Sequence, residues 1–139
     1  MLCILAVSMG IRAEEHAVQT TEKEVVQEAV QETEKVTLSK SLMPIFARSC
    51  SGCHKREGGN AKAIEHKIFY EKPEDVIAQV GRLIIAGAPE KSHLVNVVTP
   101  PKPNERKEIM PPPRSQAQKL SEKEIQLLMT WIKEGAKNN

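Results

Sequence analysis

The sequence has 139 residues and a formal net charge of +2, and only 3% of its residues are aromatic. This length suits one modest domain without an internal repeat, and so few rings leave a thin core that a large apolar cofactor would complete. Basic and acidic residues are interspersed without an aromatic-basic binding motif, which argues against nucleic acid as a partner.

Residues 1–13 contain a short apolar run, Leu2 to Met9, before a polar sequence that begins at Glu14. A membrane-spanning helix needs about 20 apolar residues, so this run is too short for an anchor. We therefore expect residues 1–13 to be a signal peptide that is removed together with Cys3, and the mature chain to have no membrane span. The expected location is the periplasm or another exported compartment.

An acidic segment follows at residues 14–38. Between Glu14 and Lys35 there are seven Glu residues but no Gly and no aromatic residue. Its apolar stripe is too small to stabilise an independent helix. We expect a flexible or weakly helical tether, with a partner-binding helix as the alternative, and a folded domain at residues 39–139.

The predicted domain is basic. Residues 40–139 contain 17 Lys and Arg against 11 Asp and Glu, a net charge of about +6. Such a surface favours acidic protein partners through electrostatic steering, although scattered Lys residues also serve solubility.

Four helices are expected in the domain, and no strand pattern competes with them. The first covers about residues 41–50, with Pro44 in its opening turn and an apolar face that includes Phe46. The second begins at Pro73 and ends near Gly81.

The last two predicted helices have N-terminal capping residues. Ser92 can cap a short third helix. Ser121 and Glu124 make a capping box for the fourth, which carries apolar residues at helical spacing. The stretches 99–104 and 111–113 are too rich in proline for regular structure and are expected to be loops.

The strongest chemical signal is the sequence from Cys50 to His54, Cys-Ser-Gly-Cys-His, which is the pattern for covalent attachment of haem c. Two cysteines at this spacing on a turn lie on one side of the backbone, where both sulfurs can form thioethers with the haem vinyl groups. His54 is then directed at the iron, with its other ring nitrogen free to donate a hydrogen bond. We predict one covalent haem c per chain, held by Cys50 and Cys53, with His54 on the iron.

Three other interpretations of the motif are weaker: chance, a redox-active disulfide and half of a zinc site. A thioredoxin-like disulfide should open a helix after a strand in a βαβ pattern, which this sequence lacks. A structural zinc site needs four ligands, and beyond the motif only the scattered His66 and His93 could contribute.

Iron bound by His54 still needs a sixth ligand or an open position, and this choice separates electron transfer from ligand binding or catalysis. Met110 is the best candidate, because three prolines follow it in a polar loop where a methionine is poor core material. His66 and His93 are the rival ligands, although surface or packing roles are commoner for such histidines.

These residues resemble the class I cytochrome c family, in which the attachment motif follows the first helix and the Met ligand comes late in the chain. Over about residues 38–137 the sequence is similar, more narrowly, to the cytochrome c domains abundant in planctomycetes and related bacteria. The most similar stretches are 46–54, 86–92, 109–112 and 131–136.

The resemblance implies an all-α cytochrome c fold, with about four short helices and long loops around one covalently bound haem. It implies His54 and Met110 as the axial ligands. It also implies a first helix packed across the last, where Phe46 could meet Leu128 or Trp131.

The expected function is transfer of single electrons between redox partner proteins outside the cytoplasm, without enzymatic activity. A peroxidase with two haems would need a second attachment motif, and this chain has one. Two alternatives stay open: a haem sensor or gas-binding module in which Met110 is displaced, and an accessory haem subunit of a larger oxidoreductase.

Overall fold

Two adjoining helices begin the part of the chain that the computed structural model describes, residues 35–139. The π-helix η1 (Leu38–Leu42) continues directly into α2 (Met43–Ser49). Pro44 lies in the opening turn of α2, where the missing proline N–H would have no helical partner. Together the two elements form the helix expected at residues 41–50.

The domain begins earlier than expected. Residues 1–34, which include the expected signal peptide and most of the expected tether, lie outside the described residues. Val36 and Leu38 are buried in the hydrophobic core, and the compact unit starts at Lys35 rather than at residue 39. These two apolar residues were assigned to the tether because the segment before them is acidic. In the structure they contribute to the thin core.

The next two helices are short. The helix α3 (Ala61–Glu65), which was not expected, is capped by the side chain of Asn60. The helix α4 (Pro73–Ile77) begins at Pro73 as expected but ends before Gly81. After Ile77 the chain tightens into turns: the amides of Gln79 and Val80 donate to the carbonyls of Val76 and Ile77 at 3.0 and 2.9 Å, and Gly81 takes a φ of +85°.

A 3₁₀ turn, η2 (Pro89–Lys91), precedes α5 (His93–Val98). The expected third helix is therefore present, but the predicted role of Ser92 is wrong, because its side chain makes no capping hydrogen bond. The Ser92 hydroxyl instead accepts from the amide of Ile85 at 2.9 Å and donates to the carbonyl of Ala88 at 3.0 Å. It closes the loop before the helix.

The longest helix is α6 (Glu122–Lys133), and its capping box is confirmed. The Ser121 hydroxyl accepts from the amide of Glu124 at 3.3 Å, and the Glu124 carboxylate accepts from the amide of Ser121 at 2.9 Å. After the helix, Gly135 takes a positive φ of +103°.

The residues after α6 return to the start of the domain. The side-chain oxygen of Asn139 accepts from the amide of Leu38 at 2.9 Å, and its carbonyl accepts from the amide of Ser39 at 3.0 Å. These two amides belong to the first turn of η1, where helical amides have no partner within their own helix. Asn139 therefore caps the first helix from the far end of the domain.

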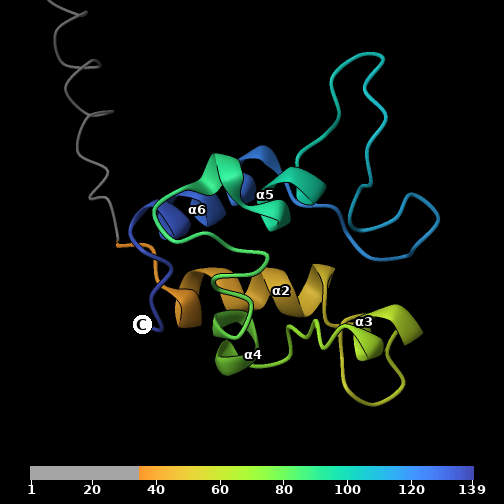
Figure 1. Ribbon diagram of the computed structural model, residues 1–139, viewed down its shortest axis with the longest axis horizontal. Coiled ribbons are helices and arrows are strands. Elements are labelled where there is room, and N and C mark those ends of the chain that lie inside the picture. Colours follow the sequence, from red (N-terminus) through yellow and green to blue (C-terminus); the bar gives the residue numbers. More distant parts are fainter. Residues whose placement is uncertain (1–34) are drawn as a thin grey trace, which may run out of the picture. The chain divides into compact units, whose positions relative to one another are not determined.

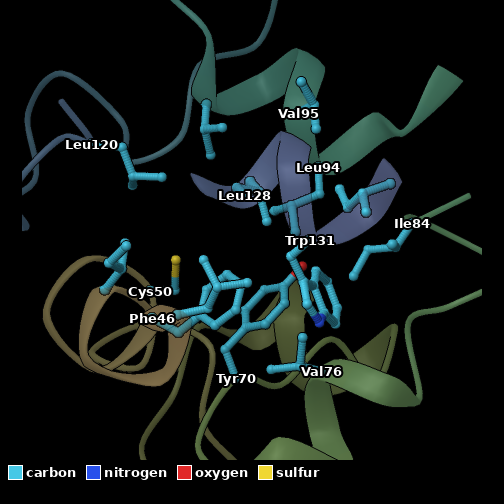
Figure 2. Close-up of a cluster of buried hydrophobic side chains, with 14 of the residues drawn as sticks. Phe46, Cys50, Tyr70, Val76, Ile84, Leu94, Val95, Leu120, Leu128 and Trp131 are labelled. Carbon is cyan, nitrogen blue, oxygen red and sulfur yellow. The ribbon is translucent and has the colours of Figure 1, made fainter. Parts of the chain in front are cut away.

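One hydrophobic core lies between the first helical segment and the pair α5 and α6 (Figure 1). Phe46, Leu128 and Trp131 are almost completely buried and belong to the same cluster (Figure 2). The ring that stacks on Phe46 is that of Tyr70, with centroids 5.2 Å apart. The first helical segment meets α6 through η1 and through an ion pair of 2.9 Å between Arg48 and Glu124.

The described domain is all-α with long loops, as expected. Within residues 35–139 there is no β-strand, and Val80 and Ile84 form only an isolated bridge. The proline-rich stretches lie in a loop between α5 and α6 that has no helix and extends away from the other elements (Figure 1). No helix in this part of the chain combines the length and apolar character that crossing a membrane requires.

Candidate haem-attachment site

The attachment motif forms a tight turn at the end of α2. The amides of Cys53 and His54 donate to the carbonyl of Cys50 at 3.1 and 2.9 Å. Cys50 is buried and Cys53 is exposed, and both thiols are free. In Figure 2 the Cys50 sulfur points into the space between α2 and the side chains of Leu120 and Leu128. The turn therefore offers one sulfur to the apolar interior and one at the surface.

The environment of the motif disfavours the two rival chemistries. Burial raises the pKa of the Cys50 thiol to about 12, whereas redox-active cysteine pairs depend on a stabilised thiolate. Within residues 35–139, no three His, Cys, Asp or Glu side chains are grouped so that they could hold a metal ion. Thioether formation with a haem vinyl group requires neither feature.

The turn after His54 depends on Gly59. A Cβ atom at Gly59 would overlap the carbonyl oxygen of Lys55 and would lie 2.8 Å from that of Cys53. The neighbouring amide of Asn60 donates to the carbonyl of Cys53 at 2.8 Å. Only glycine lets the chain fold back this closely over the motif.

The imidazole of His54 is held in one tautomer. Its Nδ1 lies 3.1 Å from the carbonyl oxygen of Ile68, which can only accept a hydrogen bond. Nδ1 therefore carries the proton, and Nε2 keeps a lone pair for a metal ion. The Tyr70 ring lies against this imidazole in an edge-on arrangement, with centroids 5.4 Å apart. The hydrogen bond expected from the free ring nitrogen is thus present.

Tyr70 also binds the backbone of the motif. Its amide donates to the carbonyl of His54 at 3.0 Å, and its carbonyl accepts from the hydroxyl of Ser51 at 2.8 Å. Burial raises the pKa of the Tyr70 phenol, so this side chain stays neutral. In the sequence Tyr70 is only one of four aromatic residues, and its contacts to the motif could not be foreseen.

An ion pair anchors the chain just after the motif. Arg56 donates to both carboxylate oxygens of Asp75, which is only 5% exposed and also accepts from the amide of Lys72 at 3.1 Å. The hydrogen bond from Arg56 holds the pKa of the Asp75 carboxyl below its usual range. Sequence reasoning missed this pair, because Asp75 looks like an ordinary acidic residue in the first turn of a helix.

Met110 lies where the proline loop meets the core. Its amide donates to the carbonyl of Val97 in α5 at 2.8 Å, and its half-buried side chain packs against the hydrophobic cluster. The following Pro111 is buried and joined by a cis peptide bond. Since Cys50 belongs to that cluster, Cys50 and Met110 border the same apolar interior. No hydrogen bond within the described residues joins Met110 to the motif.

The rival histidines are less well placed. His66 follows α3 and His93 begins α5, and both are exposed. Neither belongs to the buried cluster that contains Cys50.

The donor set fits haem c. A buried thiol and an exposed thiol suit two thioether bonds, and a neutral imidazole and a thioether are established axial ligands of haem iron. The apolar residues around the Cys50 sulfur suit a porphyrin, which needs an environment that excludes water (Figure 2). Asp75 is the one charged side chain buried among the described residues, and it is paired with Arg56.

Comparison with known proteins agrees with this chemistry. A family model described as Cytochrome c matches residues 44–136, which is more than half of the chain. The match includes the attachment motif, Met110 and all of α6. Searches of curated proteins and of solved structures gave no match.

Proposed function

Because this chain belongs to the cytochrome c family, we propose that it is a mono-haem electron carrier that works outside the cytoplasm, in the periplasm or another exported location. The family binds haem c covalently and serves haem-based electron transfer. In our proposal Cys50 and Cys53 hold the haem, and His54 and Met110 bind its iron. The observation that carries this proposal is the free Nε2 of His54, set by its Nδ1 bond to Ile68.

When bound, the haem supplies a one-electron couple between ferric and ferrous iron. The residues of the chain give that couple a constant environment. Ile68 and Tyr70 keep the His54 ring in one orientation, and the apolar cluster excludes water from the interior that Cys50 faces. A thioether from Met110 would raise the reduction potential relative to a second imidazole.

The positive charge of the loop around Met110 favours an acidic partner protein. Residues 99–119 contain five basic residues against two Glu, and most of these basic side chains are exposed. The basic residues are Lys102, Arg106, Lys107, Arg114 and Lys119. Their positive potential would steer an acidic redox protein toward the part of the domain that carries Met110. We propose no substrate and no enzymatic reaction.

Two finer assignments belong to this proposal. We place the chain in the planctomycete-type subgroup on the stretches 86–92, 109–112 and 131–136. We also favour a permanently bound Met110 over a haem sensor or gas-binding module, because the amide of Met110 is fixed to Val97 and its side chain packs on the core.

Replacement of Met110 by alanine tests the proposal. We expect the oxidised wild-type protein to show the weak near-infrared absorption band of Met ligation. Met110→Ala should lose that band, bind carbon monoxide and have a lower reduction potential, because a thioether stabilises ferrous iron. Optical spectra and a redox titration measure these changes.

The matched control is Met129→Ala, since Met129 is also half-buried against the core but lies on α6. This variant should keep the band. Persistence of the band in Met110→Ala would refute the ligand assignment, and its absence in the wild type would favour a sensor or gas-binding module.

A further inference from the structure

A segment of four residues lies along the attachment motif. This clasp segment, residues 68–71, contacts residues 51–56 through every one of its members. Ile68 accepts the hydrogen bond from His54, while Tyr70 donates its amide to the His54 carbonyl and accepts from the Ser51 hydroxyl. The Phe69 ring lies beneath the Arg56 guanidinium, 4.8 Å from its carbon, and the Glu71 carboxylate accepts from the Arg56 amide at 2.9 Å.

The chain that leads into the clasp segment holds it by one backbone hydrogen bond, from the amide of Ile68 to the carbonyl of Ala63 at 2.9 Å. The intervening residues 57–67 are almost all exposed and contain only the single short helix α3. A second link is the bidentate ion pair between Arg56 and Asp75, which joins two positions that are 19 residues apart in the sequence. Arg56 is two residues beyond His54, and Asp75 lies in the first turn of α4, which begins two residues after the clasp segment.

We infer that Asp75 is a positioning residue for the proximal iron ligand: through Arg56 it holds the clasp segment on the motif and so fixes the hydrogen bond from His54 to Ile68. The inference rests on the proposed function, in which His54 binds the iron. A hydrogen bond from Nδ1 makes Nε2 a stronger electron donor to a metal ion. A stronger donor favours ferric iron and lowers the reduction potential, so the pair sets the potential without touching the haem.

Three variants separate positioning from charge. Asp75→Asn keeps the shape of the side chain but offers Arg56 only one acceptor. Arg56→Lys keeps the positive charge but loses the fork that binds both oxygens. Glu71→Gln is the matched control: it removes one negative charge beside Arg56 yet leaves the fork on Asp75 intact and keeps an acceptor for the Arg56 amide.

The measurements are the reduction potential of each purified holoprotein and the NMR signal of the His54 Nδ1 proton. We expect Asp75→Asn and Arg56→Lys to raise the potential and to make that proton exchange at least ten times faster with solvent. Glu71→Gln should change the exchange less than twofold. If Asp75→Asn does not accumulate as a folded protein, Arg56→Lys gives the same two readings.

Other results would overturn the inference. Equal shifts in Asp75→Asn and Glu71→Gln with none in Arg56→Lys would assign the effect to charge alone. A lower melting temperature with unchanged potential and unchanged proton exchange would leave Asp75 a purely structural role. Failure of the proposed function would look different, because the wild-type protein itself would then lack covalent haem.

Discussion

The two regions that carry the candidate iron ligands are held by different means. In the proximal region, residues 50–75, five side chains make hydrogen bonds in or around the motif: those of Ser51, His54, Arg56, Glu71 and Asp75. In the distal region, residues 99–119, Met110 is fixed mainly by one backbone hydrogen bond to Val97 and by the prolines after it. The proximal ligand is therefore oriented by specific partners, whereas the distal ligand depends on the stiffness of its loop.

This contrast identifies which of the two proposed iron ligands is held less firmly. A ligand that depends on several bonds resists displacement, because all of them must open together. A ligand on a loop with few bonds leaves at lower cost. In the proposed cytochrome Met110 stays bound, yet of the two ligands it is the one that costs less to displace.

The largest expected effect is at the attachment motif. Cys50→Ala and Cys53→Ala should each leave at most one thioether, and the double variant should lose all covalent haem. Haem staining of denaturing gels measures this directly. In contrast, Met110→Ala should keep its covalent haem, because the distal region takes no part in attachment. Full covalent haem in the double variant would contradict the proposed attachment through Cys50 and Cys53, and with it the contrast between the two regions.

A smaller effect is expected in the packing beneath the proximal ligand. Phe46→Ala should lower the free energy of unfolding by about 3–5 kcal/mol, because Phe46 is fully buried and stacks on Tyr70. The distal counterpart Ile109→Ala should lower it by only about 1 kcal/mol, since Ile109 is half-buried in the loop. Denaturant titrations compare the two variants, and equal losses would contradict the contrast between the regions.

The smallest expected effect is the acid dependence of the proximal ion pair. Arg56 holds the folded-state pKa of Asp75 below its usual range, so the stabilisation is complete above the unfolded-state pKa of about 3.9. It is lost as the pH falls from there through the folded-state pKa. Melting temperatures recorded between about pH 7 and pH 2 should therefore fall less steeply below pH 4 for Asp75→Asn than for the wild type.

Some acid dependence should remain in that variant. The hydrogen bond from the Ser121 amide, aided by Arg48, also holds the pKa of Glu124 below its usual range. If the melting temperatures of Asp75→Asn and the wild type fall equally steeply below pH 4, the ion pair of Arg56 with Asp75 contributes nothing measurable to stability.

Features that depend on residues close together in the sequence were the easiest to recognise. The motif from Cys50 to His54, the capping box of Ser121 and Glu124, and the proline loop after Met110 could be recognised because their partners are close in sequence. The helix at residues 61–65 was missed, although Asn60 is a common capping residue. Too few apolar residues follow Asn60 to make that signal visible.

Features that depend on distant partners could not be predicted. Asp75 was assigned to a helix, but nothing in the sequence showed that Arg56 would bind it across 19 positions. Ser92 was expected to cap the third helix, but its hydroxyl makes hydrogen bonds to Ile85 and Ala88 in the preceding loop. Leu38 was assigned to the tether, because burial is decided by the elements that cover a residue and not by its neighbours in sequence.

The hydrogen bonds of Asn139 to Leu38 and Ser39 bring the first and last turns of the domain to one place. A polypeptide joined to either end would enter and leave the domain at neighbouring points. Such a domain can be inserted into a surface loop of another protein without pulling that loop apart. The described domain thus has the arrangement of ends that insertion into a longer polypeptide requires.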